Sequence, residues 1–102
     1  MDVIEPFVAL VIYPTTPAAQ SRHADNLARI ASENIRLLPG FLGGRVFVSE
    51  DGDSLVTITE WSDRESFVHF RTSEFGQAAV RLAAELHPVA HWLRQHAAIE
   101  AP

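Results

Sequence analysis

A continuous apolar run near the start of the chain constrains the fold more than any other feature. Residues 7–13 read FVALVIY between Pro6 and Pro14 and are rich in β-branched and aromatic side chains, which is typical of a β-strand. Strand side chains alternate between two faces, so this strand is apolar on both of them. Both faces of the predicted sheet therefore need to be covered.

A helix is predicted to follow this strand. Thr15-Thr16-Pro17 offers a hydroxyl N-cap and a proline at the first helical position, where its missing N–H costs nothing. Apolar side chains recur at helical spacing from Leu27 to Leu38, and charged side chains take the other faces. Pro39-Gly40 ends this long amphipathic helix.

A β-hairpin is the next predicted element. Residues 41–50 form a strand whose Gly43-Gly44 pair indicates a bulge or a close backbone approach. The Asp51-Gly52-Asp53 turn returns the chain into a strand over residues 54–61, with glycine where a positive φ is needed. The two strands are therefore expected to pair.

Two helical segments follow the hairpin. Ser62 as N-cap with Glu65 as the capping-box acid predicts a short helix over residues 64–70, which Thr72-Ser73 interrupts. The next helix ends before His87-Pro88. Its predicted apolar face consists of Phe75, Ala78, Ala79, Leu82, Ala83 and Leu86.

The remaining residues complete a sheet. We expect residues 89–99 to form a strand, because three strands alone leave the sheet without a partner for its open edge. The order β-α-β-β-α-β is that of an α+β, ferredoxin-like fold with an antiparallel sheet and helices on one face. Residues 1–102 make a single domain with a core over about residues 6–99. The bare apolar face is expected to pack against a second copy, which makes a homodimer.

Composition excludes several classes of function. Thirteen acidic against eight basic residues give a net charge of −5, the wrong sign for a protein that neutralises nucleic-acid phosphates. The absence of cysteine excludes disulfides, thiolate nucleophiles and iron–sulfur clusters. No apolar run is long enough for a membrane span, and residues 1–6 are acidic where a signal peptide is basic. We therefore expect a cytoplasmic protein without nucleic-acid or membrane partners.

The third strand carries the candidate site. Leu55, Thr57, Thr59 and Trp61 share one face, and hydroxyls beside an indole N–H on an apolar face are typical of a pocket for an aromatic ligand. The alternative is that Trp61 is core packing and the threonines are ordinary strand formers. His69, in the following helix, is the candidate base that titrates near neutrality, or else a half-exposed surface histidine.

Three stretches of the chain resemble the antibiotic biosynthesis monooxygenase family of dimeric α/β-barrel proteins. They are FVALVIYP, LLPGFLGGRVFVSEDG and VTITEWSDRESFVHF, and the likeness extends over residues 6–86. Within that family the chain is most similar to small cofactor-independent oxygenases that convert an anthrone-type ring of an aromatic polyketide to a quinone. The resemblance implies a small aromatic substrate, O₂ and no cofactor.

The site residues of that branch are an Asn and a Trp from the third strand, a Tyr from the next helix and an Arg from the helix after it. Trp61 and Arg81 match two of them, whereas Thr57 stands in place of the Asn and Phe67 in place of the Tyr. The resemblance implies that Arg81 steadies a substrate oxyanion. The predicted catalytic set is Trp61, Thr57, Arg81 and His69, and the predicted substrate-binding set is Thr59, Leu55, Phe67 and Phe70.

Metal and haem are not expected. Haem-degrading members of the family carry a Trp and a ligating His at positions that correspond to Phe70 and Val80, and valine cannot ligate iron. His87, His91 and His96 suggest a metal site, but Pro88 separates the first two and no carboxylate completes a ligand set.

The preferred interpretation is a cofactor-independent monooxygenase that acts on a polyketide anthrone or phenol in secondary metabolism. Triplet O₂ reacts with a singlet molecule only through one-electron transfer, so the protein has to stabilise a substrate anion in a site closed to water. Two alternatives stay open: a polyketide cyclase or isomerase that works by acid–base chemistry, and a non-catalytic barrel that binds a small aromatic ligand. The sequence names neither the substrate nor the general base.

Overall fold

The computed structural model describes residues 6–102, apart from the side chains of Phe75, Ala78, Ala79 and Leu82. The apolar face predicted for the last helix rests largely on those four side chains and so lies outside the described part. The elements are β1 (Phe7–Pro14), α1 (Gln20–Glu33), the 3-10 helix η1 (Ile35–Leu37), β2 (Phe41–Val48), β3 (Ser54–Trp61), α2 (Arg64–Thr72), α3 (Glu74–Ala84) and β4 (Val89–Arg94).

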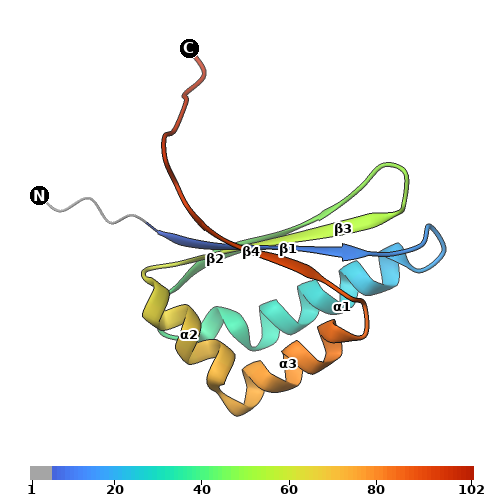
Figure 1. The fold of residues 1–102 in the computed structure, drawn as a ribbon, viewed down its shortest axis with the longest axis horizontal. Coiled ribbons are helices and arrows are strands. Elements are labelled where there is room, and N and C mark those ends of the chain that lie inside the picture. Colours follow the sequence, from blue (N-terminus) through green and yellow to red (C-terminus); the bar gives the residue numbers. More distant parts are fainter. Residues whose placement is uncertain (1–5) are drawn as a thin grey trace, which may run out of the picture.

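The four strands form one antiparallel sheet in the order β2-β3-β1-β4. The helices all lie on one side of it, and Figure 1 shows no other described element over the opposite face. This arrangement confirms the predicted α+β, ferredoxin-like fold. Within residues 6–102 the helices are too short or too polar for a bilayer crossing.

Strand β1 lies in the middle of the sheet, between β3 and β4. Ala9 is paired with Thr59 on one side and Trp92 on the other, and Val11 is paired with Thr57 and Ala90. Because strand side chains alternate, these residues share the face that the helices cover, and Val8, Leu10 and Ile12 share the bare face. The strand that is apolar on both sides thus occupies the central position that its composition requires.

The hairpin between β2 and β3 has the predicted features. Gly52 has a φ of +82° at the turn, and the pairing shifts register between Phe41 and Gly43, which is the expected bulge. A Cβ on Gly44 would lie 3.3 Å from the carbonyl oxygen of Ile58. The close backbone approach predicted for the glycine pair therefore occurs at Gly44.

The ends of the first helix differ from the prediction. Helix α1 begins at Gln20 instead of Pro17, and its N-cap residue, Ala19, makes no side-chain capping hydrogen bond. The Thr15 hydroxyl donates to the Gly52 carbonyl at 3.0 Å, which ties the segment before the helix to the hairpin turn. The α-helix also ends at Glu33, and the residues up to Leu37 form the separate turn η1. The predicted continuous helix to Leu38 is therefore wrong.

Two further boundaries are corrected. The N-cap of α2 is Asp63, whose carboxylate accepts from the Ser66 N–H at 2.7 Å, because the backbone N–H of Ser62 is held by the Gly40 carbonyl at the strand end. The last strand stops at Arg94, short of the predicted residue 99. Beyond Arg94 the chain leaves the sheet and extends away from it (Figure 1).

The main buried cluster lies at one end of the sheet, and Tyr13 and Leu55 are buried at the other end. Ala9, Trp61 and Phe67 form the centre of the main cluster, and the partly buried side chains packed on them are Phe7, Ile35, Leu38, Phe41 and Phe70. By contrast, α1 contains no fully buried residue although its apolar side chains are arranged along one face. The space between the middle of the sheet and α1 is therefore not filled by side chains.

Candidate functional site

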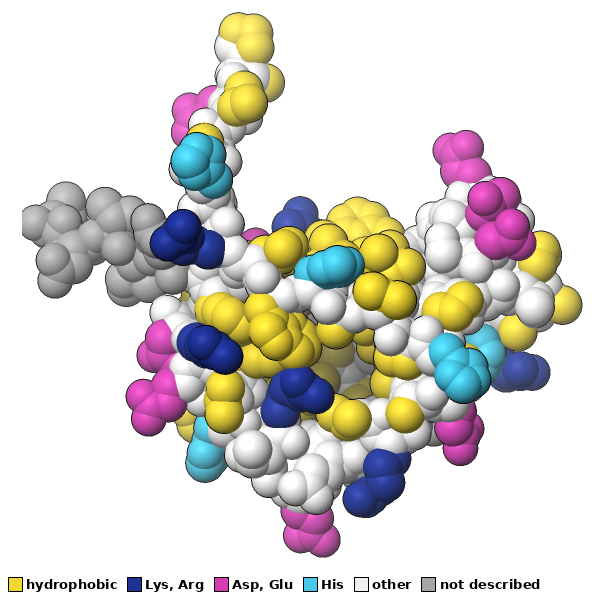
Figure 2. All heavy atoms as spheres, in the orientation of Figure 1, with side chains coloured by type: hydrophobic (Ala, Val, Ile, Leu, Met, Phe, Trp, Pro, Cys, Tyr) yellow, Lys and Arg dark blue, Asp and Glu magenta, His cyan; other side chains and the backbone are white. Residues whose placement is uncertain are grey.

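A cavity of about 690 Å³ lies between the sheet and the helices. Its floor is formed by the strands, and α1, α2, α3 and η1 contribute to its walls. Figure 2 shows it as a hollow among apolar side chains on this side of the molecule. The volume falls within the range of roughly 300–1,000 Å³ that is usual for small-molecule sites.

The middle of the cavity floor consists of small and hydroxyl-bearing residues. Ala9, Val11, Thr57 and Thr59 all line it, with Gly44 beside Thr59 on β2. Larger residues at these positions would meet α1 and fill the space. The cavity therefore results from the choice of small side chains on the strands that α1 covers.

Tyr13 lines the cavity at the end of β1 and is only 6% exposed. Its register partner is Leu55, which places it diagonal to Thr57 on the same face. Burial raises the pKa of the Tyr13 phenol, and its interaction with the Thr57 hydroxyl opposes this to a smaller extent. The phenol is therefore neutral near pH 7 and keeps a proton that it can donate to a ligand.

An aromatic cluster forms the wall at the other end of β1. The Phe67 and Trp92 rings meet edge to face with centroids 4.9 Å apart, and Phe70 stacks on Trp61 at 5.3 Å. The guanidinium of Arg71 lies 5.0 Å from the centroid of the Trp92 ring. The cavity thus combines an apolar middle with a phenol and hydroxyl at one end and aromatic rings with a guanidinium at the other.

Four of the eight predicted site residues line this cavity, namely Thr57, Thr59, Phe67 and Phe70. Leu55 and Trp61 are fully buried and do not line it. His69 and Arg81 are exposed on α2 and α3, outside the lining residues. The structure therefore brings the strand hydroxyls and the phenylalanines together, and it leaves the predicted base and the predicted oxyanion-binding arginine elsewhere.

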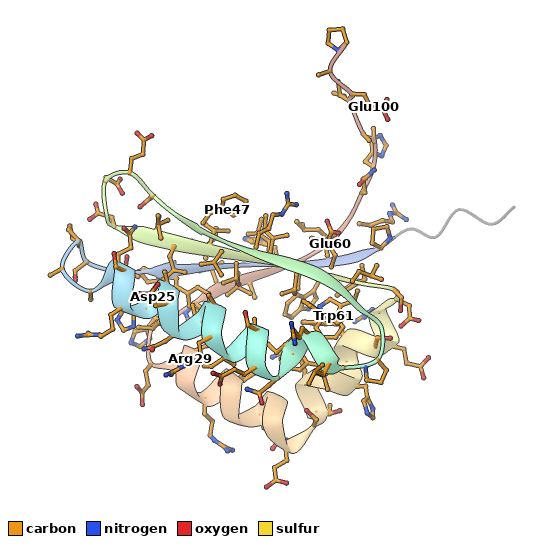
Figure 3. The ribbon with its side chains drawn as sticks, turned by 180° about the vertical axis from the view of Figure 1, so that it is seen from behind. Asp25, Arg29, Phe47, Glu60, Trp61 and Glu100 are labelled. Atoms are coloured by element: carbon orange, nitrogen blue, oxygen red, sulfur yellow. The ribbon has the colours of Figure 1, made fainter. Side chains whose placement is uncertain are left out.

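Trp61 packs behind the cavity wall instead of facing the space. Its indole N–H donates to the Thr59 hydroxyl oxygen at 3.0 Å, and in Figure 3 it lies between the sheet and the helices. Because Thr59 accepts this hydrogen bond, its own hydroxyl proton is free to point toward a ligand. Trp61 is thus core packing and also fixes the orientation of a cavity residue.

Sequence reasoning missed Tyr13, Trp92, Arg71 and Arg36, all of which line the cavity. The sequence does indicate the position of Tyr13, because strand alternation places it on the same face as Ala9 and Val11. Trp92 can be assigned to the cavity only once the pairing of β4 with β1 is known, because that pairing places it opposite Ala9. The two arginines carry no pattern in the sequence that marks them out from other helical surface charges.

The histidines near the end of the chain do not gather with other metal-binding side chains. Across the part of the chain that is described, no three His, Cys, Asp or Glu residues lie together as a metal-holding group. His87 adopts a positive φ of 54° after α3, and His91 pairs with Leu10, which puts it on the bare face of the sheet.

Comparisons with known proteins place this geometry in a family. Residues 6–82 match the family model described as antibiotic biosynthesis monooxygenase. Among curated proteins, the tetracenomycin-F1 monooxygenase of Streptomyces glaucescens is 26% identical over 61 residues, which cover 60% of this chain and 54% of that protein. The match thus spans about half the length of this curated relative.

Solved structures share the fold over nearly the whole chain. The ActVA-Orf6 monooxygenase of Streptomyces coelicolor, in complex with nanaomycin D, has a TM-score of 0.78 at 27% identity and covers 99% of this chain and 96% of its own. A conserved protein from Methanosarcina mazei has a TM-score of 0.76 at 17% identity, with 90% and 94% covered. The second likeness supports the fold alone.

Proposed function

The chain belongs to the antibiotic biosynthesis monooxygenase family, and from this premise we propose that it oxidises an electron-rich aromatic compound with O₂ and without a cofactor. The substrate class we propose is a polyketide anthrone or phenol, which the enzyme converts to a quinone. The observation that carries the proposal is the cavity of about 690 Å³, which has an apolar middle and a few hydroxyl groups on its floor.

The proposed reaction balances with O₂ as the only oxidant. An anthrone CH₂ and O₂ give a C=O and H₂O, so one oxygen atom enters the product and the other leaves as water. The substrate first loses a proton to become an enolate or phenolate, which then donates one electron to O₂. The radical pair combines at carbon, and elimination of water from the hydroperoxide yields the quinone carbonyl.

The described residues support this chemistry by binding and by charge. The apolar walls hold the aromatic rings and exclude water, which keeps the electron-rich anion from being solvated. The neutral Tyr13 phenol, whose oxygen interacts with the Thr57 hydroxyl, donates to a substrate oxygen on which negative charge develops. Thr59, with its oxygen held by Trp61, supplies a second donor.

The roles predicted for His69 and Arg81 are reassigned in this proposal. Both lie outside the residues that line the cavity, so neither is within hydrogen-bond reach of a bound ligand as the side chains stand. We assign the stabilisation of the developing substrate charge to Tyr13 and Thr59, and the substrate proton leaves to water at the open mouth. Trp61 is a positioning residue that acts through Thr59.

We also propose that the protein works as a homodimer. The bare face of the sheet carries Val8, Leu10 and Ile12 of β1 with Val56 and Ile58 of β3. An apolar sheet face of this extent requires a partner in water, and a second copy supplies an identical, self-complementary face.

Oxygen consumption tests the proposed function. Purified protein is mixed with an anthrone-type phenol, and O₂ uptake is measured together with the quinone formed and with ¹⁸O from ¹⁸O₂ in the product. We expect one O₂ consumed and one labelled oxygen incorporated for each quinone. Conversion of a substrate without O₂ uptake would replace this proposal with acid–base chemistry, and binding without conversion would replace it with a ligand-binding role.

The variant Thr57→Asn refines the same assay, because the oxygenase branch has an asparagine at this position. Thr57 lines the cavity floor beside Tyr13, so an amide there would reach a bound ligand. We expect the rate to increase if the family chemistry operates in this site. An unchanged rate would show that Thr57 takes no part in the reaction.

A further inference from the structure

The charged residues that line the cavity are all of one sign. They are Arg36, Arg45 and Arg71, and no Asp or Glu of the described chain is among the lining residues. The protein as a whole has thirteen acidic and eight basic residues, so a random sample of its charges would contain mostly carboxylates. In Figure 2 the acidic side chains lie at the periphery of this face, whereas basic side chains border the hollow.

The charge of Arg45 is directed elsewhere. Its guanidinium lies 3.9 Å from the Glu60 carboxylate and 5.9 Å from the centroid of the Phe47 ring. Figure 3 shows Phe47 and Glu60 on the side of the sheet away from the helices. Arg36 and Arg71 are therefore the cations that the cavity can offer to a ligand.

Arg71 is held in position without being neutralised. It lies in the last turn of α2, and its guanidinium carbon lies over the Trp92 ring, 5.0 Å from the ring centroid. The Phe67 ring packs edge to face against Trp92, with the two centroids 4.9 Å apart. Among the described side chains the one ion pair is that of Arg45 with Glu60. A stacked guanidinium keeps its N–H edge available, and that planar fork matches the two oxygens of a carboxylate.

The position of Arg71 at the mouth also lowers the cost of binding an anion. Trp92 is 42% exposed and Arg71 is exposed, so a carboxylate placed there keeps part of its hydration. The aromatic body of the same ligand would occupy the apolar interior. The attraction between Arg71 and a ligand carboxylate is stronger beside this apolar space than on an open surface, because the low-dielectric walls focus the field of the cation.

We propose that the cavity selects aromatic ligands that carry a carboxylate or an equally acidic group, with Arg71 on Trp92 binding that group at the mouth. The proposal rests on the proposed function in taking the cavity as the substrate site, and it defines the substrate class further. The rings enter toward Thr57 and Tyr13, and the anionic group stays at the Arg71 end. Arg71 is then a specificity-determining residue.

Equilibrium binding of two matched probes tests this inference without requiring turnover. The probes are anthraquinone-2-carboxylate and anthraquinone-2-carboxamide, which have nearly the same size and differ in charge. Binding is measured by isothermal titration calorimetry at low and at high salt. We expect the carboxylate to bind about tenfold more tightly than the carboxamide, and the difference to shrink as salt screens the charge.

Three variants show whether Arg71 is responsible. Arg71→Met retains a long side chain on Trp92 and removes the charge, so carboxylate binding should weaken about tenfold and carboxamide binding should stay within twofold. Arg71→Lys should recover part of the difference. Arg64→Met, an exposed position on the same helix that does not line the cavity, serves as the control and should change neither affinity.

The outcomes separate this inference from the proposed function. Equal binding of the two probes, or equal weakening of both by Arg71→Met, would overturn the anion selectivity while the aromatic site and its oxygen chemistry could still stand. Failure of both probes to bind would overturn the cavity as an aromatic site, and with it both proposals. Selective binding without O₂ uptake by any carboxylated anthrone would overturn the oxygenase function and leave the anion selectivity intact.

Discussion

Along the middle of β1 and β3, the face that the helices cover carries smaller and more polar side chains than the face that they leave bare. On the covered face, Val11 pairs with Thr57, and Ala9 pairs with Thr59, which has Gly44 on its other side. On the bare face, the corresponding residues of these two strands are Leu10, Ile12, Val56 and Ile58, with Phe47, Arg45 and His91 beside them on β2 and β4. A monomeric domain would need the larger apolar residues under its helices, where burial stabilises the fold.

The two faces of the sheet are therefore suited to different proposed roles, ligand binding on the covered face and dimer formation on the bare face. Small residues under α1 leave a cavity that a ligand can fill, and α1 accordingly has no fully buried residue. Large apolar residues on the bare face make a surface that only another molecule can bury. The main buried cluster lies around Trp61 and Phe67. The proposed ligand would fill the space on the covered face, and the proposed second copy would cover the bare face.

The largest effect is expected from a charge on the bare face. Leu10 lies on β1 opposite Ile58 and His91, and Leu10→Asp would place a carboxylate, with only the His91 imidazole opposite it, in the otherwise apolar proposed interface, which costs several kcal/mol. Light scattering should give about twice the 11.3 kDa chain mass for the wild-type protein and the single chain mass for the variant.

Ser21→Asp is the matched control, because Ser21 is exposed on α1 and the substitution adds the same charge away from the sheet. This variant should remain dimeric. A wild-type protein that is monomeric at micromolar concentration, or a dimeric Leu10→Asp variant, would show that the bare face is not the interface.

Filling the covered face should abolish function and leave the fold intact. Val11 points into the cavity from the middle of β1, so Val11→Phe occupies space that the ligand needs. Turnover should fall by about 100-fold or more, because small displacements of a substrate already have effects of that size. The free energy of unfolding should change by less than about 1.5 kcal/mol, because the new ring enters an existing space.

Val68→Phe provides the comparison for this variant, since Val68 is 44% exposed on the outside of α2. It adds the same bulk and should leave oxygen uptake unchanged. Retained turnover in Val11→Phe would contradict the assignment of the cavity as the substrate site.

Removal of the Tyr13 hydroxyl should have an intermediate effect. Tyr13→Phe keeps the ring that packs at the end of β1 and deletes one donor to the substrate oxygen, so turnover should fall about tenfold. Oxygen uptake per folded molecule is the measurement. An unchanged rate would show that the phenol is only a packing residue.

The titration of Tyr13 gives a separate check. Burial raises its pKa above the ordinary value of about 10, so the unfolded chain loses this proton at a lower pH than the folded protein does. Below pH 10 the phenol is neutral in both states, and its contribution to stability is fully present. The free energy of unfolding should fall as the pH rises above 10, and less so in Tyr13→Phe. Tyr13 is the chain's single tyrosine, so phenolate absorbance reports it directly.

The smallest effect on turnover is expected at the packed end of the sheet. Trp61 is fully buried and donates to Thr59, so Trp61→Phe should lower the free energy of unfolding by about 1–2 kcal/mol. Turnover per folded molecule should change by no more than about threefold, because Trp61 acts only by orienting Thr59. Thermal unfolding and oxygen uptake of the same preparations separate the two effects. A tenfold loss of turnover with unchanged stability would instead make Trp61 a direct participant.

Local chemistry allows most of the fold to be predicted. The two-sided apolar β1, the hairpin with Gly52 at a positive φ and the bulge at Gly43 all follow from residue type and spacing. The helix ends are less predictable, since Thr15 bonds to a hairpin turn 37 residues away. A cap depends on which backbone groups lie nearby, and distant segments supply some of them.

The candidate site is predictable along β3 and at Phe67 and Phe70 of α2. The alternation of a strand is a local property, so residue spacing alone assigns Thr57 and Thr59 to one face. The burial of Trp61 cannot be predicted from residue spacing, because it depends on the packing of Phe41, Phe67 and Phe70 around the indole. Its place behind the cavity wall follows from those rings.

Residue type and spacing were enough to establish the succession of strands and helices along this chain, its resemblance to a family, and a threonine-bearing strand face suited to a pocket. Which polar groups meet in that pocket depends on the folded arrangement. Tyr13, Arg71 and Trp92 come from β1, α2 and β4, and they reach one cavity through sheet pairing and helix packing. Alternation and helical spacing fix which face a side chain takes, but convergence of distant elements depends on how the whole chain packs.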